Sequence, residues 1–139
     1  MSAIRLICFG ESIDNLKKAI DYKVIGTKRK YNFEKGEQLY FVLKVNKVWC
    51  VCARANTNVA TDSYPFDDGN SYYPFSINRI ETCEPFSIVE LCQQYLGPYW
   101  GLKLQQPTII DSENFLAAIK ERFKPIEYNL LMEKIRQES

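Results

Sequence analysis

Two strand-like runs separated by two residues lie near the middle of the chain and constrain its fold more than any other feature. Leu39 to Val45 and VWCVCARA (residues 48–55) are rich in β-branched and aromatic side chains, which favour strands. Asn46 and Lys47 between them suit the tight connection of a hairpin. The sequence therefore predicts an antiparallel strand pair as the centre of a fold built on a β-sheet.

Further strands are predicted on both sides of this hairpin. IRLICF (residues 4–9) is a compact apolar run typical of a buried first strand. YYPFSINRIETCEPF (residues 72–86) restores strand character, with Pro74 and Pro85 marking an edge or the strand ends. WGLKLQQPTIID (residues 100–111) predicts one more short strand before its proline. Between them, residues 56–71 are turn-rich and acidic and predict a long loop.

Helical spacing of apolar residues predicts four helices, over about residues 13–20, 88–96, 113–123 and 126–139. Ser12, Ser87 and either Asp111 or Ser112 can cap the first three, and Gly26 ends the first helical pattern. The third helix has apolar residues that step by four, at Phe115, Ile119 and Phe123. The chain is then an α+β domain on a small curved mixed sheet or partly open β-barrel, flanked by helices. We expect this domain to span residues 1–124, with residues 125–139 as a C-terminal helical extension.

Charge is distributed unevenly along the chain. Residues 1–54 carry eleven Lys or Arg against five Asp or Glu, a balance of +6, and residues 55–139 carry seven against twelve, a balance of −5. The whole chain is nearly neutral at +1. Such a chain can present one basic face to a polyanion, although clustering by chance is the competing interpretation.

The five cysteines indicate a reduced protein without a metal site. Cys50 and Cys52 are two residues apart on a predicted strand, so both face the same side. This is not zinc-ligand spacing, and the chain has no histidine to complete such a site. We expect a cytoplasmic protein, because the N-terminus turns polar too early for a signal peptide and no apolar run is long enough to cross a membrane. We also expect no cofactor.

Motifs for catalysis are nearly absent, so we expect no enzyme activity. The lack of histidine removes the usual general base and triad partner. Neither GxxxxGK[ST] nor GxGxxG occurs. Asp67 and Asp68 are adjacent acids that could bind Mg²⁺, but such a pair in a loop is more often a solvated turn.

Aromatic side chains and cations interleave in the first half of the chain. The stretch IGTKRKYNFEKGEQLYF (residues 25–41) is the densest example. Cations can hold a phosphate backbone while rings stack on an unstacked base, but most rings in a small domain belong to its core. Tyr99 and Trp100 are flanked by glycine and proline, which lets both rings project from a turn toward a ligand.

Taken in order, these segments resemble the EVE domain and its relatives in the PUA-like superfamily, which includes the YTH readers of methylated adenine. The similar stretches in this chain are IRLICFGES, VIGTKRKY, EKGEQLYFVLK, KVWCVCARA, YPFDDGNSYYPFSINRIETCEPFSIVEL and GLKLQQPTIIDSENFLAAI. The resemblance implies a non-catalytic reader whose small barrel accepts a modified base, as in modification-dependent restriction systems. Ile25 stands where such domains usually place a tryptophan, which leaves the exact ligand open.

The resemblance also implies where the ligand contacts lie. We expect a base pocket near Ser12, Gly26, Thr27, Trp49, Tyr99 and Trp100. We expect phosphate contacts from Lys28, Arg29, Lys30, Lys44, Lys47 and Arg54. The expected partner is nucleic acid, with DNA favoured over RNA and no membrane, and the chain is compatible with being the N-terminal module of a larger protein.

Other functions remain open at this point. A pocket for a free nucleotide or another small anion, in a sensor or sequestering protein, would keep the aromatic cavity but need the cations little. A protein-interaction module could use the proline- and tyrosine-rich residues 64–75. A hydrolase comes last, because no acid–base machinery is visible.

Overall fold

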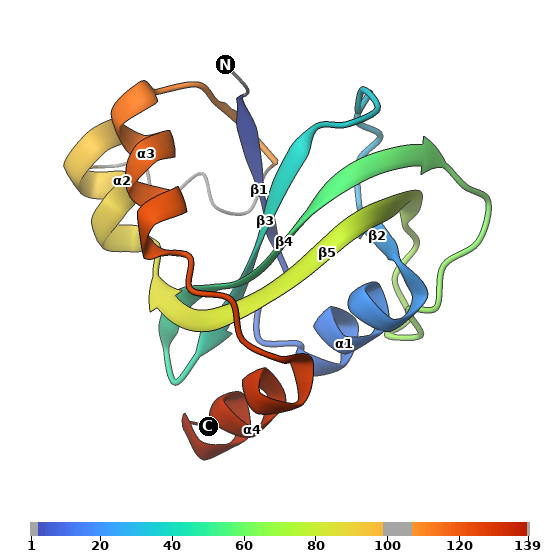
Figure 1. Cartoon of the computed structure of the whole chain (residues 1–139). Helices are drawn as coiled ribbons and strands as arrows, with labels where there is room; N and C mark the ends of the chain where they lie inside the picture. Colours follow the sequence, from blue (N-terminus) through green and yellow to red (C-terminus); the bar gives the residue numbers. More distant parts are fainter. Residues whose placement is uncertain (1–2, 99–106, 139) are drawn as a thin grey trace.

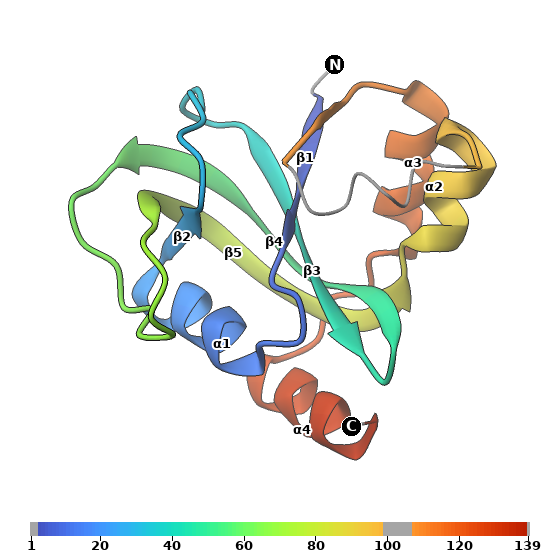
Figure 2. The same ribbon diagram turned by 180° about the vertical axis from the view of Figure 1, so that it is seen from behind.

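The structure, a computed structural model, describes residues 3–98 and 107–138. Its strands form one sheet in the order β2-β5-β4-β3-β1-β6, which curls into a half-barrel (Figures 1 and 2). The strands are β1 (Ile4–Cys8), β2 (Val24–Thr27), β3 (Gln38–Val45), β4 (Val48–Ala60), β5 (Tyr73–Ser87) and β6 (Ile109–Ile110). β1 pairs with β3 in parallel, and the other neighbours are antiparallel. The predicted α+β class and curved mixed sheet are confirmed.

Helices cover both faces of the sheet, so the molecule has two cores. The helices are α1 (Ile13–Tyr22), α2 (Val89–Leu96), α3 (Glu113–Arg122) and α4 (Tyr128–Glu138). Along β3, Tyr40 and Val42 face a core shared with α2 and α3, and Leu39, Phe41 and Leu43 face one shared with α1 and α4. This strand is therefore apolar from Leu39 to Leu43, as strands buried on both faces are.

The predicted hairpin joins β3 to β4 through Asn46 and Lys47. Both residues adopt positive φ, 47° and 66°, as the two central residues of a type I′ turn do. The register places Lys44 directly opposite Trp49. Cys50 and Cys52 both belong to the core on the α1 and α4 side, as the strand period predicts. All five cysteines are free thiols.

Local capping explains where two of the helices begin. Ser12 Oγ accepts a hydrogen bond from the Asn15 N–H at 3.1 Å, and Ser112 Oγ accepts one from the Phe115 N–H at 3.4 Å. These contacts satisfy donors that the first helical turn leaves free. Ser87 was predicted as a cap and is not one: it is the last residue of β5 and pairs with Cys50. α2 begins after Ile88 without a side-chain cap.

The sheet differs from the prediction at two strands: β2 was not predicted, and β4 is longer than predicted. β2 was not predicted, because four residues that include a glycine give no periodic signal of their own; its pairing with β5 makes it a strand. β4 continues to Ala60, so the predicted loop starts later, at residue 61. The polar Thr57 is 1% exposed there and its hydroxyl accepts from the Glu37 N–H at 2.8 Å. The predicted strand before Pro107 falls mostly on residues 100–106, outside the described residues.

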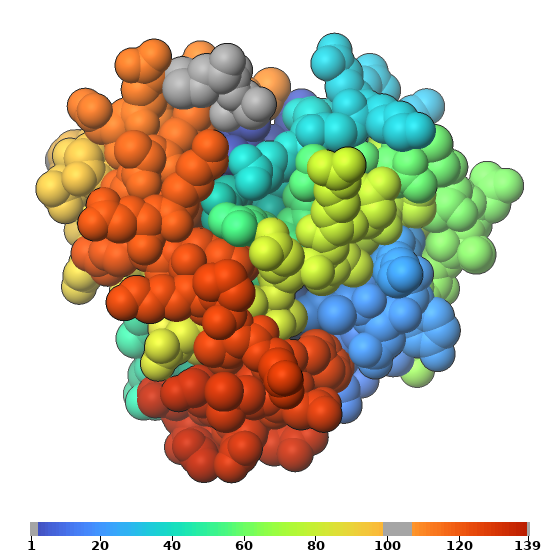
Figure 3. All heavy atoms as spheres, in the orientation of Figure 1, coloured from blue at the N-terminus to red at the C-terminus, as the bar shows by residue number. Residues whose placement is uncertain are grey.

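Residues 125–139, expected as a helical extension, contain α4, which packs against the sheet. Leu131 and Ile135 are fully buried in the same core as Leu16 of α1. In the space-filling view α4 covers one end of the molecule, next to α1 (Figure 3). α4 therefore contributes to a core of the half-barrel.

Candidate functional site

A cavity of about 530 Å³ lies between the end of β1, the start of α1, the end of β2 and the segment that precedes β5. β2 is the first strand in the sheet order and β1 lies near the other edge, so the cavity sits where the half-barrel would close. A volume of this size is within the range of small-molecule sites.

The turn from β1 into α1 forms one wall of the cavity. Gly10 adopts a left-handed φ of 60°, and its carbonyl accepts a hydrogen bond from the Lys44 N–H at 2.7 Å. The Phe9 N–H donates to the Val42 carbonyl at 2.8 Å. These bonds fix the turn on β3, so that Ser12 faces the cavity from the first position before α1. The half-buried Cys8 thiol also lines the cavity, and burial raises its pKa.

The end of β2 forms the opposite wall. A Cβ atom on Gly26 would lie 2.9 Å from Cβ and Cγ of Tyr72 and 3.0 Å from Cε2 of Phe66, which is closer than real side chains allow. Gly26 therefore permits these two rings to lie against the β2 backbone. Thr27 donates its hydroxyl to the Arg29 carbonyl at 2.6 Å, which turns the chain after the strand.

Three rings in the segment before β5 pack together beside the cavity. The Phe66 and Tyr72 centroids are 5.1 Å apart, and Tyr64 lies 5.4 Å from Tyr72. Phe66 also belongs to a small apolar cluster with Ala19 and Val24. Because Phe66 and Tyr72 line the cavity, their rings give the cavity an aromatic wall.

Two acids attach the same segment to α1. Asp67 binds Lys18 Nζ at 2.7 Å, and this contact lowers the pKa of the carboxyl group. Asp68 accepts hydrogen bonds from the Tyr72 hydroxyl and from the Asn15 amide, the latter at 3.0 Å. These two donors hold the pKa of Asp68 well below its usual range. Burial and the Asp68 carboxylate raise the pKa of Tyr72 to about 12, so its hydroxyl stays a donor.

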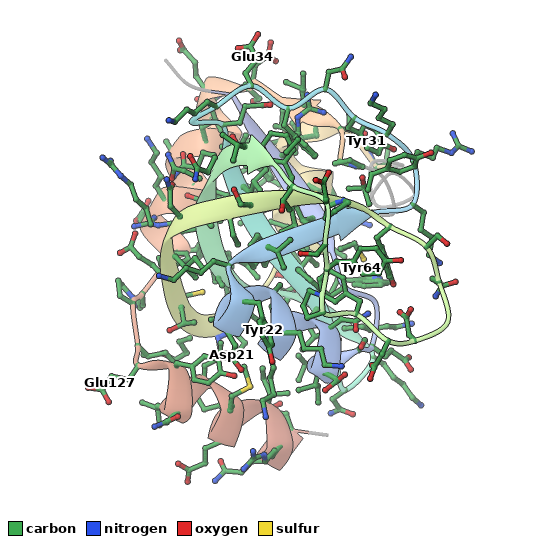
Figure 4. All side chains as sticks on the ribbon, turned by 90° about the vertical axis from the view of Figure 1, so that its right-hand side faces the viewer. Asp21, Tyr22, Tyr31, Glu34, Tyr64 and Glu127 are labelled. Atoms are coloured by element: carbon green, nitrogen blue, oxygen red, sulfur yellow. The ribbon has the colours of Figure 1, made fainter. Side chains whose placement is uncertain are left out.

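A short cationic segment follows β2 at the cavity. Lys28 and Arg29 line it, and the adjoining Lys30 is exposed like both of them. Among the described residues, no acidic side chain forms an ion pair with any of the three. Tyr31, the next residue, also lines the cavity. Figure 4 labels Tyr31 and Tyr64 on the same side of the molecule, on the segments after β2 and before β5.

Three of the six predicted base-pocket residues line this cavity, namely Ser12, Gly26 and Thr27. Trp49 is not among the described residues that line it; the ring packs against the core of α2 and α3. Tyr99 and Trp100 lie outside the described residues. Sequence reasoning did not assign Asn15, Phe66 or Tyr72 to the pocket, because only the folded chain brings the segment before β5 against α1 and β2.

The predicted phosphate contacts fall into two groups. Lys28, Arg29 and Lys30 lie at the cavity, as described above. Lys44, Lys47 and Arg54 lie on the β3–β4 hairpin, which contributes no side chain among the described residues that line the cavity. Lys44 Nζ is 5.4 Å from the Trp49 centroid, and Arg54 binds Glu81 at 3.0 Å while its Cζ lies 3.9 Å from the Phe123 centroid.

The chemistry of the cavity is that of a binding site with mixed walls. It offers aromatic faces, a serine hydroxyl, an asparagine amide, the two cations Lys28 and Arg29, and the two acids Glu11 and Asp68. Within the described part of the chain, no cluster of three or more His, Cys, Asp or Glu residues could hold a metal ion. The described helices are also too short or too polar to cross a membrane.

Comparison with known proteins adds no assignment. No protein-family model matches the chain, and no curated protein matches its sequence. The function of the cavity is accordingly argued from its own residues.

Proposed function

We propose that this chain is a nucleic-acid-binding reader that takes a single base, preferentially a modified one such as a methylated base, into the cavity between β1 and β2. The observation that carries the proposal is the exposed segment Lys28–Lys30, which has no acidic partner among the described residues and is continuous with a cavity of about 530 Å³. The cations hold the phosphates on either side of the base, and the cavity reads the base.

The cavity walls supply what an extruded base requires. Removing a base from its stack costs a few kcal/mol, which stacking and hydrogen bonds in the pocket have to offset. Phe66, Tyr72 and Tyr31 provide aromatic surface. Ser12 Oγ accepts from the Asn15 N–H and keeps its own proton as a donor. Asn15 donates its amide to Asp68, which leaves its carbonyl oxygen as an acceptor for the edge of a base.

The PUA-like assignment remains part of this proposal. It is supported by the order of elements, in which a strand and a helix precede a short strand, a hairpin and a long return strand, followed by α2, the short β6, α3 and α4. It is also supported by the curled sheet, with the cavity where the barrel would close. By the same resemblance we propose DNA ahead of RNA as the partner.

The test is binding of labelled 12-nucleotide single strands, measured by fluorescence anisotropy across a salt series. The strands carry a central N6-methyladenine, a central 5-methylcytosine or no modification. The variant Lys28→Gln/Arg29→Gln/Lys30→Gln should weaken binding about tenfold or more at low salt. It should also reduce the slope of log K against log salt by up to about 2, since each single-strand phosphate contact contributes about 0.7.

A control variant removes the same charge elsewhere. Lys120→Gln/Arg122→Gln/Lys124→Gln changes three exposed cations of α3 and the segment that follows it, and should bind as the unmodified protein does. Absence of binding to every strand at low salt contradicts the proposal. Equal binding to modified and plain strands removes only the preference for a modified base. Binding of mononucleotides that does not depend on Lys28–Lys30 would favour the free-nucleotide alternative.

A further inference from the structure

Tyr73 is a solvent-exposed aromatic residue beside the cationic segment. Its side chain is 53% exposed, although it belongs to β5. It pairs directly with Thr27, which lines the cavity and immediately precedes Lys28. Residues that pair directly across two strands project from the same face with their Cβ atoms about 5 Å apart. Tyr73 therefore lies beside Thr27, on the strand next to the cavity wall and close in register to the exposed cations.

The neighbouring aromatic rings pack against other rings, whereas Tyr73 makes no such ring contact among the described residues. Phe75 contacts Phe33 with centroids 5.3 Å apart, and Tyr31 lies 6.1 Å from Phe33. Tyr72 packs against Phe66 on the other side of β5. Among the described residues, neither a ring contact nor a side-chain hydrogen bond involves Tyr73. Its ring is thus about half open to solvent and is not engaged in such contacts.

We infer that the base next to the one in the cavity stacks on Tyr73, so that the substrate class of this site is single-stranded nucleic acid. This inference rests on the proposed function. Cations that follow a phosphate backbone, together with exposed rings on which bases stack, are the two elements of single-strand binding sites. A base inside an intact duplex has both faces covered by its neighbours and offers none to Tyr73.

A second exposed tyrosine in a different electrostatic setting gives a matched control. Tyr22 is 68% exposed at the end of α1, next to Asp21. The C-terminal end of a helix carries partial negative charge, which disfavours a nearby phosphate. Figure 4 shows Asp21 and Tyr22 on the side of the molecule toward α4, well separated from Tyr31. Exposure alone is therefore not the basis of the inference.

The experiment measures anisotropy with three probes of one sequence: a 12-nucleotide DNA strand with a central N6-methyladenine, the equivalent RNA strand, and the DNA strand annealed in a blunt duplex. Tyr73→Ala should weaken binding to the single strands about tenfold, because it removes one base–aromatic stack. Tyr73→Phe, which keeps the ring, and Tyr22→Ala should bind within about twofold of the unmodified protein. The DNA and RNA arms show whether the stacked strand is of one kind or both.

A further probe tests the stacking partner itself. A DNA strand with an abasic site next to the central base removes the base that Tyr73 contacts. The unmodified protein should bind this strand about tenfold more weakly than the intact strand. The Tyr73→Ala variant should bind both strands with the same affinity. Tyr73→Ala binding that equals the unmodified protein overturns the inference and leaves the proposed function intact. If Tyr73→Ala weakens binding to the single strand and to the duplex by the same factor, the inference is also overturned. If the unmodified protein binds no strand, both proposals fail.

Discussion

Two regions of this molecule have similar composition and different surroundings. The segment after β2 holds Lys28–Lys30 followed by Tyr31, and the β3–β4 hairpin holds Lys44, Lys47 and Arg54 around Trp49. On the hairpin, Lys44 lies over the Trp49 ring and Arg54 binds Glu81 and the Phe123 ring, while Lys47 is exposed and has no such contact among the described residues. After β2, the three cations are exposed, with no acidic partner among the described residues.

This difference shows what a cation next to a ring means in a sequence. When a ring or an opposite charge lies within reach, as for Lys44 and Arg54, the cation is engaged within the fold and is less available to a ligand. When neither does, the cation remains available for an anion, and the position of a cavity decides whether that matters. The segment after β2 combines such free cations with the cavity of about 530 Å³, whereas Lys44, Lys47 and Arg54 are not among the described residues that line it.

The largest effect is expected from closing the cavity at Gly26. Gly26→Ala places a methyl group about 3 Å from Tyr72 and Phe66, so both rings have to move. Forced repacking of this kind costs about 1–3 kcal/mol of unfolding free energy. Binding of the 12-nucleotide strands should fall more than tenfold. Urea denaturation and anisotropy measure the two effects.

A neighbouring variant separates these two effects. Ile25→Val removes one methyl group from a fully buried side chain and should cost about 0.5–1.5 kcal/mol of stability, without narrowing the cavity. Its binding should remain unchanged below the unfolding transition. If Gly26→Ala binds as Ile25→Val does, the cavity is not the binding site.

A smaller effect is expected on the free energy of unfolding, which should fall when a hairpin cation is removed and stay nearly constant when a cation after β2 is removed. Arg54→Gln removes a 3.0 Å ion pair and a contact 3.9 Å from the Phe123 centroid, and should lower the unfolding free energy by about 1 kcal/mol. Arg29→Gln should change it by less than about 0.5 kcal/mol, since an exposed residue without a partner loses little. Equal losses in urea denaturation would show that the two regions do not differ as described.

Much of the fold was predictable because its signals are local. The hairpin turn, the Ser12 and Ser112 caps and the step of four along α3 each depend on a few adjacent residues. The turn also fixes Lys44 opposite Trp49, a pairing that the expected base pocket and phosphate contacts did not take into account. β2 has no such local signal, because its strand conformation comes from pairing with β5, which lies about fifty residues later.

The site was predictable only in part, for the same reason. Ser12, Gly26 and Thr27 were expected from the resemblance to EVE domains, and all three line the cavity. Phe66 and Tyr72 come from a segment whose turn-rich, acidic sequence predicts only a loop. Lys18 and Asn15 of α1 hold that loop through Asp67 and Asp68, contacts that no local pattern shows.

The most direct test of the account is whether a nucleic acid strand covers Cys8. This thiol lines the cavity and is half-buried, and the other four cysteines are buried at 9% exposure or less. Because burial raises the pKa of Cys8, alkylation by N-ethylmaleimide should be slow near neutral pH and accelerate as the pH rises. Mass spectrometry follows the rate, with Cys8→Ser as the background. We expect the 12-nucleotide strand to slow Cys8 alkylation in the unmodified protein and not in the Lys28→Gln/Arg29→Gln/Lys30→Gln variant. A strand that binds while Cys8 reacts at its free rate would contradict the account.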